Sequence, residues 1–183
     1  VMNVIKGFTP EIEEVSIDEA YADLTGLDIV YKTSYAELIN KIRQTVLNKT
    51  KIPVSIGLST SKTLAKLASD KAKSTGGIYI IKPENVLSTI GNDDIKEICG
   101  IGHNNSRKLN FNGVFSVRDF LQKDNAWIKM VLGIRGLNLK FELSGINTSP
   151  VNSAPQAPQS IQDTKSFADF TDNYEFLLAE LNI

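Results

Sequence analysis

Two adjacent carboxylates, Asp18 and Glu19, follow the apolar-rich stretch 15–17 and precede an alanine and a tyrosine. Neighbouring side chains on an extended strand point to opposite faces, so a turn or bulge is needed to bring both carboxylates to one site. Like charges this close repel each other unless solvent or a cation screens them, and Mg²⁺ prefers one or two carboxylates together with substrate phosphates. The pair therefore indicates either a site for a hard metal ion or a solvated turn.

A second chemical feature is a predicted helix over 61–73 that follows a predicted strand and carries two lysines. Lys62 and Lys66 are four residues apart and share one helix face, which suits phosphate contact or plain solvation. The stretch superficially resembles a P-loop, but the two glycines that such a loop needs are replaced by Ile56 and Ser61. A phosphate-binding NTPase is therefore disfavoured.

The third feature is a glycine pair, Gly100-Ile101-Gly102, between two predicted helical segments, with Arg107 and Lys108 in the second segment. Glycines that flank an apolar residue between helices are typical of a helix-hairpin-helix, whose backbone amides bind a DNA phosphate without reading sequence. The basic side chains would add a salt-dependent attraction. The alternative is an ordinary turn between two helices.

The composition limits the chemistry further. The 183 residues include 20 Lys and Arg, 21 Asp and Glu, one Cys and one His, for a net charge of −1. A single Cys excludes an intramolecular disulfide, and a single Cys and His exclude multi-Cys and multi-His metal sites, so a metal would be a hard ion with oxygen ligands. Near neutrality hides an asymmetry, because residues 1–30 hold one base and seven acids whereas residues 41–82 hold nine bases and one acid. An acidic segment beside a basic one suits a site for metal and phosphate, although an ordinary charged surface has the same composition.

Periodicity predicts the elements that position these residues. The N-terminal part is expected to hold the end of a helix over 1–8 and then two strands, a helix, a strand, a helix and a strand, in one sheet with helices on a face. Their predicted ranges are 11–17, 20–25, 34–48, 52–58, 61–73 and 78–81. The strand 52–58 is expected to be buried, and Ser34 with Glu37 forms a capping box for the first helix of this series.

The chain changes character after Pro83, where short helical segments separated by glycines predict a compact helical unit. The predicted segments are 84–90, 93–98, 104–111, 117–122 and 125–132. Prolines and small polar residues make 150–159 a predicted linker, followed by a strand over 160–167 and a helix over 172–181. No apolar run approaches the length of about 18 residues that a membrane span requires, so no membrane partner is expected.

Three of these segments together resemble the Y family of translesion DNA polymerases. Residues 16–21 read S-I-D-E-A-Y, like the family signature S-[IL]-D-E-[AV]-[FY], and residues 57–70 are similar to a recurrent motif of the family's palm. Residues 98–109 resemble the motif of the family's thumb. The resemblance runs from residue 1 to about 170. Details at 24–26, 63–68 and 165–167 are most similar to the branch of the DNA polymerase V catalytic subunit.

The resemblance implies an α+β fold: a partial polymerase palm over 1–82, with an antiparallel or mixed ferredoxin-like sheet and helices on one face, and an all-α thumb over 83–149. The linker 150–159 and the start of a little-finger domain over 160–183 would follow. A complete family member opens with a strand that supplies a further metal-binding Asp, and this sequence lacks it. The chain is therefore expected to be a fragment with little or no polymerase activity of its own. The alternative is a non-catalytic DNA-binding or interaction module that uses only the hairpin and the lysine helix.

The resemblance also assigns roles. Asp18 would ligate Mg²⁺ (two ions in a complete member), Glu19 would be the neighbouring catalytic carboxylate, and Lys66, with Lys62 as a weaker candidate, would contact the triphosphate of a dNTP. DNA phosphate would be bound by the hairpin and the helix after it: Gly100, Ile101, Gly102, Arg107 and Lys108. The implied partners are primer–template DNA, a sliding clamp and SOS accessory proteins, in the bacterial cytoplasm at the nucleoid.

Overall fold

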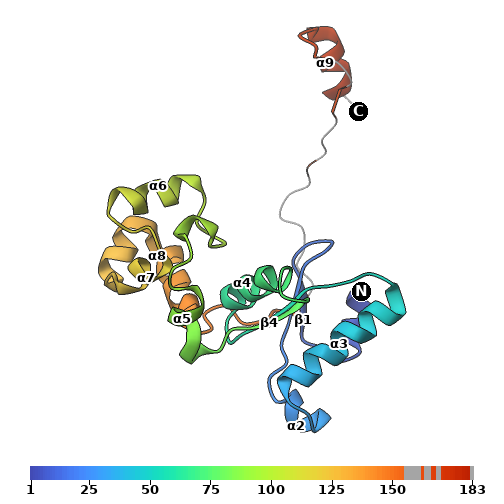
Figure 1. Cartoon of the computed structure of the whole chain (residues 1–183). Coiled ribbons are helices and arrows are strands. Elements are labelled where there is room, and N and C mark those ends of the chain that lie inside the picture. The colour runs from blue at the N-terminus through green and yellow to red at the C-terminus, as the bar shows by residue number, and fades with distance from the viewer. Residues whose placement is uncertain (155–161, 163–165, 168–169, 182–183) are drawn as a thin grey trace. The chain divides into compact units, whose positions relative to one another are not determined.

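The structure is a computed structural model that describes residues 1–154, 162, 166–167 and 170–181 (Figure 1). It divides into two compact units, Val1–Ser153 and Ala154–Ile183. The boundary between the two units falls inside the predicted linker. The residues predicted to do chemistry all lie in the first unit.

The first part of this unit holds helices and short strands in the predicted order, with one helix, α2, that was not predicted. The elements are α1 (Met2–Lys6), β1 (Ile12–Glu14), β2 (Ala20–Ala22), α2 (Leu27–Tyr31), α3 (Tyr35–Thr50), β3 (Ile56–Leu58), α4 (Lys62–Ala72) and β4 (Ile78–Ile80). The predicted capping box is confirmed, because the Glu37 amide donates to Ser34 Oγ and the Ser34 amide donates to Glu37 Oε2. Local sequence signals therefore place the helices well.

The prediction of one sheet is wrong for the residues that the structure describes. β1 pairs antiparallel with β2, β3 pairs parallel with β4, and these two ribbons form separate two-stranded sheets. Residues of both β2 and β3 line one cavity, and these two strands are not paired with each other. The prediction of a buried strand from residue 52 is also wrong: β3 begins at Ile56 and Ile52 is 53% exposed. Pro53 has no amide hydrogen to donate to a strand ladder.

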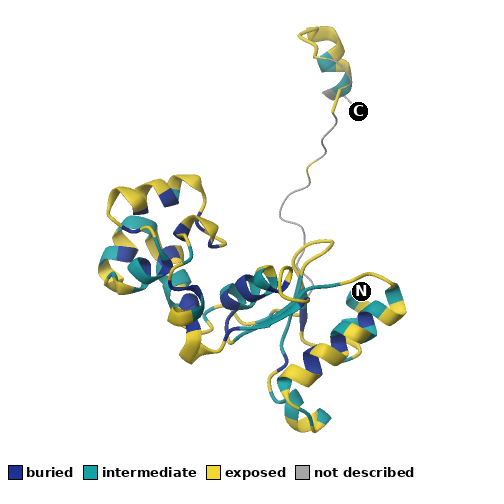
Figure 2. Cartoon of the chain, viewed as in Figure 1, coloured by how far each residue is buried: buried dark blue, intermediate teal, exposed yellow. Residues whose placement is uncertain are grey.

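Helix α4 packs on β3 so closely that only glycine fits at one position. A Cβ on Gly57 would lie 2.1 Å from both the Ala65 carbonyl oxygen and the Ser69 amide nitrogen. The core of the helical part also includes buried residues of α4, namely Leu64, Leu67 and Ala68. Figure 2 shows buried residues along this helix. Helix α4 contacts β3 and β4 on one hand and α8 on the other. One hydrophobic core therefore includes residues from both sides of position 82/83, the predicted boundary between palm and thumb.

The helical part begins at Pro83, as predicted. Its elements are the 3₁₀ helix Pro83–Asn85, α5 (Val86–Ile90), the 3₁₀ helix Ile95–Glu97, α6 (His103–Phe111), α7 (Val117–Gln122) and α8 (Asn125–Leu143). The predicted end of the last helix at residue 132 coincides with a break in α8, and the helical segment beyond that break was not predicted. Gly133 interrupts the helical backbone with φ +70° and ψ −164°, and the helix then resumes to Leu143.

In the second unit the structure describes the helix α9 (Tyr174–Leu181), close to the predicted range. The rings of Phe167 and Phe176 meet edge-on with centroids 5.3 Å apart. The predicted strand 160–167 lies mostly outside the described residues, and the residues described there, 162 and 166–167, are not in a strand. Across the described part of the chain, none of the helices has the length and apolar character needed to cross a membrane.

Candidate active site

The two carboxylates lie where β1 turns into β2. The amides of Val15 and Ser16 donate to the Glu19 carbonyl oxygen at 2.9 and 3.2 Å, which closes the turn. Ser16 Oγ also donates to Asp18 Oδ1 at 2.7 Å. Both carboxylate residues are exposed, and Ile17 between the strands is fully exposed. The turn thus supplies the break in strand geometry that the adjacent carboxylates require.

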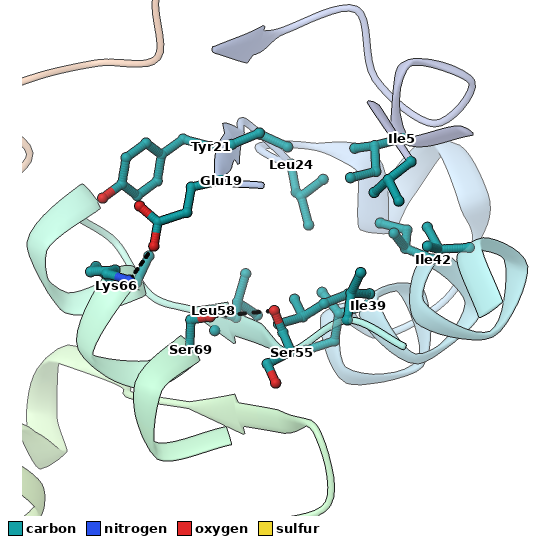
Figure 3. A pocket seen from close by; sticks show the side chains of 18 of the residues that line it. Ile5, Glu19, Tyr21, Leu24, Ile39, Ile42, Ser55, Leu58, Lys66 and Ser69 are labelled. Carbon is teal, nitrogen blue, oxygen red and sulfur yellow. Dashed lines mark hydrogen bonds and ion pairs between the residues drawn. The ribbon is translucent and has the colours of Figure 1, made fainter. Parts of the chain in front are cut away.

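Lys66 on α4 meets this turn. Its Nζ lies 2.5 Å from Glu19 Oε1 (Figure 3). The same Nζ lies 3.5 Å from Asp70 Oδ1. The hydrogen bond to Glu19 raises the pKa of Lys66 above its usual value, and Asp70 adds to the rise. The structure therefore brings together Glu19 and Lys66, two residues that are 47 positions apart in the sequence and that the sequence singled out separately.

Lys62, one turn earlier on α4, is bound to a different carboxylate. Its Nζ lies 2.5 Å from Glu13 Oε2 and 5.5 Å from the centre of the Tyr21 ring. Burial by itself would raise the pKa of Glu13, but hydrogen bonds from Lys62 and from the Asn152 amide outweigh it and lower that pKa. Sequence reasoning missed Glu13, although its place in the acidic segment opposite the lysines was a signal for such a contact.

Tyr21, whose ring lies beside Lys62, is half-buried. Burial raises the pKa of its phenol, the Cys99 thiol and the carboxylates of Glu19 and Glu13 add to the rise, and Lys66 opposes it. The neutral phenol and its ring form the wall of the site on the β2 side.

A cavity of about 220 Å³ adjoins the contact between Glu19 and Lys66. Figure 3 shows apolar side chains, among them Leu24, Ile39 and Ile42, around the cavity beyond this ion pair. The charged groups therefore lie at the edge of an apolar hollow and remain open to solvent.

The donor set at the turn fits a hard metal ion in type but is small in number. Asp18 and Glu19 supply carboxylate oxygens, the ligands that Mg²⁺ prefers. Within the described ranges, however, no group of three or more Asp, Glu, His or Cys side chains is placed to hold a metal ion. Lys66 also already neutralises part of the charge on Glu19. The turn is therefore suited to be one part of a metal site.

The predicted hairpin is built around Gly100, which has φ +95°, and Gly102, which precedes α6. Ile101 is 4% exposed, and its amide donates to the Ile98 carbonyl oxygen at 2.9 Å. This amide is therefore engaged inside the turn rather than directed to a ligand. Arg107 and Lys108 are exposed on α6, where they can meet a phosphate backbone.

Comparison with known proteins defines the class. Residues 1–70, which contain the carboxylate turn and most of α4, match the impB/mucB/samB family. The chain is also similar in structure to a Y-family DNA polymerase chimera, at 34% identity and a TM-score of 0.69 over 82% of this chain and 44% of that one. The proteins to which this chain is homologous are thus Y-family DNA polymerases.

The individual relatives carry the name DNA polymerase IV. The protein of Oceanobacillus iheyensis is 31% identical over 91% of this chain and 38% of its own length, and that of Saccharolobus solfataricus is 38% identical over 73% and 37%. The crystal structure of DinB from Sulfolobus solfataricus has a TM-score of 0.67 and 35% identity over 83% of this chain and 45% of that one. The chain spans less than half the length of these relatives. The predicted closeness to the DNA polymerase V branch is not supported.

Proposed function

We propose that this chain is part of a Y-family DNA polymerase and contributes carboxylates and lysines to template-directed nucleotidyl transfer. The observation that carries the proposal is the contact between Glu19 and Lys66, which joins a carboxylate turn to a lysine helix. A polymerase site needs these two kinds of group side by side, because it must hold metal ions and a triphosphate together.

In this proposal Asp18 and Glu19 would hold a divalent ion, which when bound supplies positive charge to the transferring phosphoryl group. Ser16 Oγ holds one oxygen of Asp18 and so fixes the direction of its carboxylate. Lys66 would exchange Glu19 for triphosphate oxygens, and the partial exposure of both side chains allows that exchange. Lys62 is less available, since Glu13 and the Tyr21 ring already hold it.

The proposal extends to DNA through the helical part. Arg107 and Lys108 are exposed on α6, close to the turn 100–102. Among the described residues, the backbone amides of Gly100 and Gly102 donate no hydrogen bond to another backbone group. These amides would bind a phosphate without reading sequence. A solved relative titled "Insertion ternary complex of Dbh DNA polymerase", 34% identical with a TM-score of 0.68, supports a substrate-binding role for this fold.

The finer parts of the proposal rest on the sequence motifs. They are a palm over 1–82, a thumb over 83–149, a linker over 150–159 and the start of a little finger over 160–183. They also include translesion synthesis in SOS mutagenesis, two Mg²⁺ ions, a sliding clamp, SOS accessory proteins and a cytoplasmic, nucleoid-associated location. A non-catalytic DNA-binding module is the second candidate, favoured by the small number of metal-binding carboxylates in the described part of the chain.

The test measures binding of metal and nucleotide rather than turnover. Addition of Mn²⁺ with a dNTP should broaden the NMR signals of Asp18 and Glu19, and Asp18→Asn should abolish the effect. Glu84→Gln, which changes an exposed carboxylate away from the turn, serves as the control and should leave the broadening intact. Equal broadening in the native chain and in Asp18→Asn would contradict the proposal and favour the second candidate.

A further inference from the structure

Helix α8 carries a carboxylate inside the protein, Glu142, which is only 5% exposed. None of the ion pairs of the described residues includes it, so no lysine or arginine neutralises its charge there. A buried carboxylate without partners is strongly destabilising, and such groups persist only when hydrogen bonds satisfy both oxygens.

Both oxygens of Glu142 are satisfied, and by two different segments. Oε2 accepts the Thr63 amide at 3.0 Å. Oε1 accepts the Thr148 amide at 2.8 Å, the Thr148 hydroxyl at 3.1 Å and the Ser149 amide at 3.2 Å. The carboxylate thus bridges the start of α4 and the segment that follows α8.

Thr63 is the second residue of α4, so its amide is one of those that the helix itself cannot satisfy. The N-terminal end of a helix also carries a partial positive charge that favours an anion. Ser61, the N-cap residue, adds a second tie, because its hydroxyl donates to the Glu142 carbonyl oxygen at 2.7 Å and accepts the Leu64 amide at 3.3 Å. Thr60 Oγ1 donates to the Gly145 carbonyl oxygen at 2.8 Å.

We propose that Glu142 is the internal anion of the N-terminus of α4 and a positioning residue for the lysine helix. Its carboxylate occupies the N-terminus of α4, where an external anion would otherwise be favoured, and it fastens α4, with Lys62 and Lys66, to the end of α8. Phosphate groups therefore reach α4 along the Lys66 side rather than at its N-terminus. The inference does not depend on polymerase activity, since it rests on contacts within this chain alone.

The first test removes the carboxylate and supplies it again from solution. Glu142→Ala should lower the Tm by about 6 °C or more, because buried amides lose a charged acceptor. Acetate, which matches the deleted group, should restore part of this loss, and chloride at equal ionic strength should not. Glu84→Ala, at an exposed position, should leave the Tm and its response to acetate unchanged. Recovery with acetate no larger than with chloride would overturn the role as internal anion.

The second test keeps the shape of the side chain and does not depend on Glu142→Ala folding. Glu142→Gln retains one acceptor oxygen, so either the Thr63 amide or the Thr148 amide must lose its partner, whereas the Ser149 amide keeps Asn147 Oδ1. Hydrogen exchange at the abandoned amides should become about tenfold faster or more, while Glu84→Gln should exchange like the native chain. Unchanged exchange at all of these amides in Glu142→Gln would overturn the proposal.

Discussion

Two carboxylates bound by α4 differ in surroundings and, we infer, in purpose. Glu19 contacts Lys66 near the middle of the helix and its side chain keeps 49% of its exposure. Glu142 contacts the start of the same helix and is 5% exposed. The exposed pair is weak and exchangeable, as surface ion pairs generally are. The buried carboxylate is held, through partly buried hydrogen bonds, by the amides of Thr63, Thr148 and Ser149. Burial thus separates the contact suited to chemistry from the contact suited to positioning.

The largest loss of stability is expected from a change at the contact between α4 and β3, which positions the lysine helix. Gly57→Ala would place a Cβ 2.1 Å from the Ala65 carbonyl oxygen, a clash with helix backbone that no side-chain rotation relieves. We expect the free energy of unfolding to fall by about 3 kcal/mol, measured by urea denaturation. The matched change Gly102→Ala, where an added Cβ has open space, should cost far less. Equal losses would show that α4 is not packed as described.

Removal of Lys108 tests whether the helical part binds nucleic acid. Lys108→Ala should weaken duplex DNA binding several-fold and lower its salt dependence, because one phosphate contact is lost. Fluorescence anisotropy at several salt concentrations measures both quantities. Lys49→Ala removes an exposed lysine of α3 and should have no such effect, and Asp18→Ala should leave binding nearly unchanged. Identical affinities for Lys108→Ala and Lys49→Ala would remove the helical part from the proposed interface.

Acid should weaken the contact between Glu13 and Lys62 of α4. Hydrogen bonds from Lys62 and Asn152 hold the pKa of Glu13 below its ordinary value of 4.5 against the effect of burial. A depressed pKa stabilises the fold above the ordinary value, and the contribution is lost as pH falls through the folded-state pKa. The free energy of unfolding should be measured from about pH 6 down to about pH 3, a range that brackets the ordinary pKa of a glutamate. It should fall less in Glu13→Gln than in the native chain. A parallel loss in both proteins would contradict the assignment.

The smallest effect on stability is expected at the exposed pair. Lys66→Met should change the free energy of unfolding by at most about 1 kcal/mol, since the partner carboxylate is half-exposed and screened by solvent. The same substitution should strongly reduce nucleotide binding. A large loss of stability would place Lys66 with the positioning contacts and would break the distinction between the two carboxylates.

The sequence predicts the local features of this fold well and its long-range contacts less well. The capping box at Ser34 and the exact range of α7 follow from patterns within a few residues. The division into two ribbons does not, because strand pairing depends on partners distant in the chain. The contact of Lys66 with Glu19 was not itself predicted, but both residues were singled out because they lie in motifs that resemble one family.

Glu142 was not predictable for a different reason. The predicted helix ends before Gly133, so a carboxylate nine residues later gave no sign of burial. Its partners, the amides of Thr63 and Thr148, are backbone groups that every sequence contains. A buried charge satisfied by backbone amides leaves no motif in the sequence and is found only in a structure.

The most direct test of the central claim follows the Lys66 ammonium group by NMR during titration with a dNTP and Mg²⁺. The account predicts that the Lys66 signal shifts and saturates as the lysine leaves Glu19 for phosphate, that the Lys62 signal moves much less, and that Asp18→Asn suppresses the shift. A Lys66 signal that stays fixed while nucleotide binds, or a shift that persists in Asp18→Asn, would contradict it.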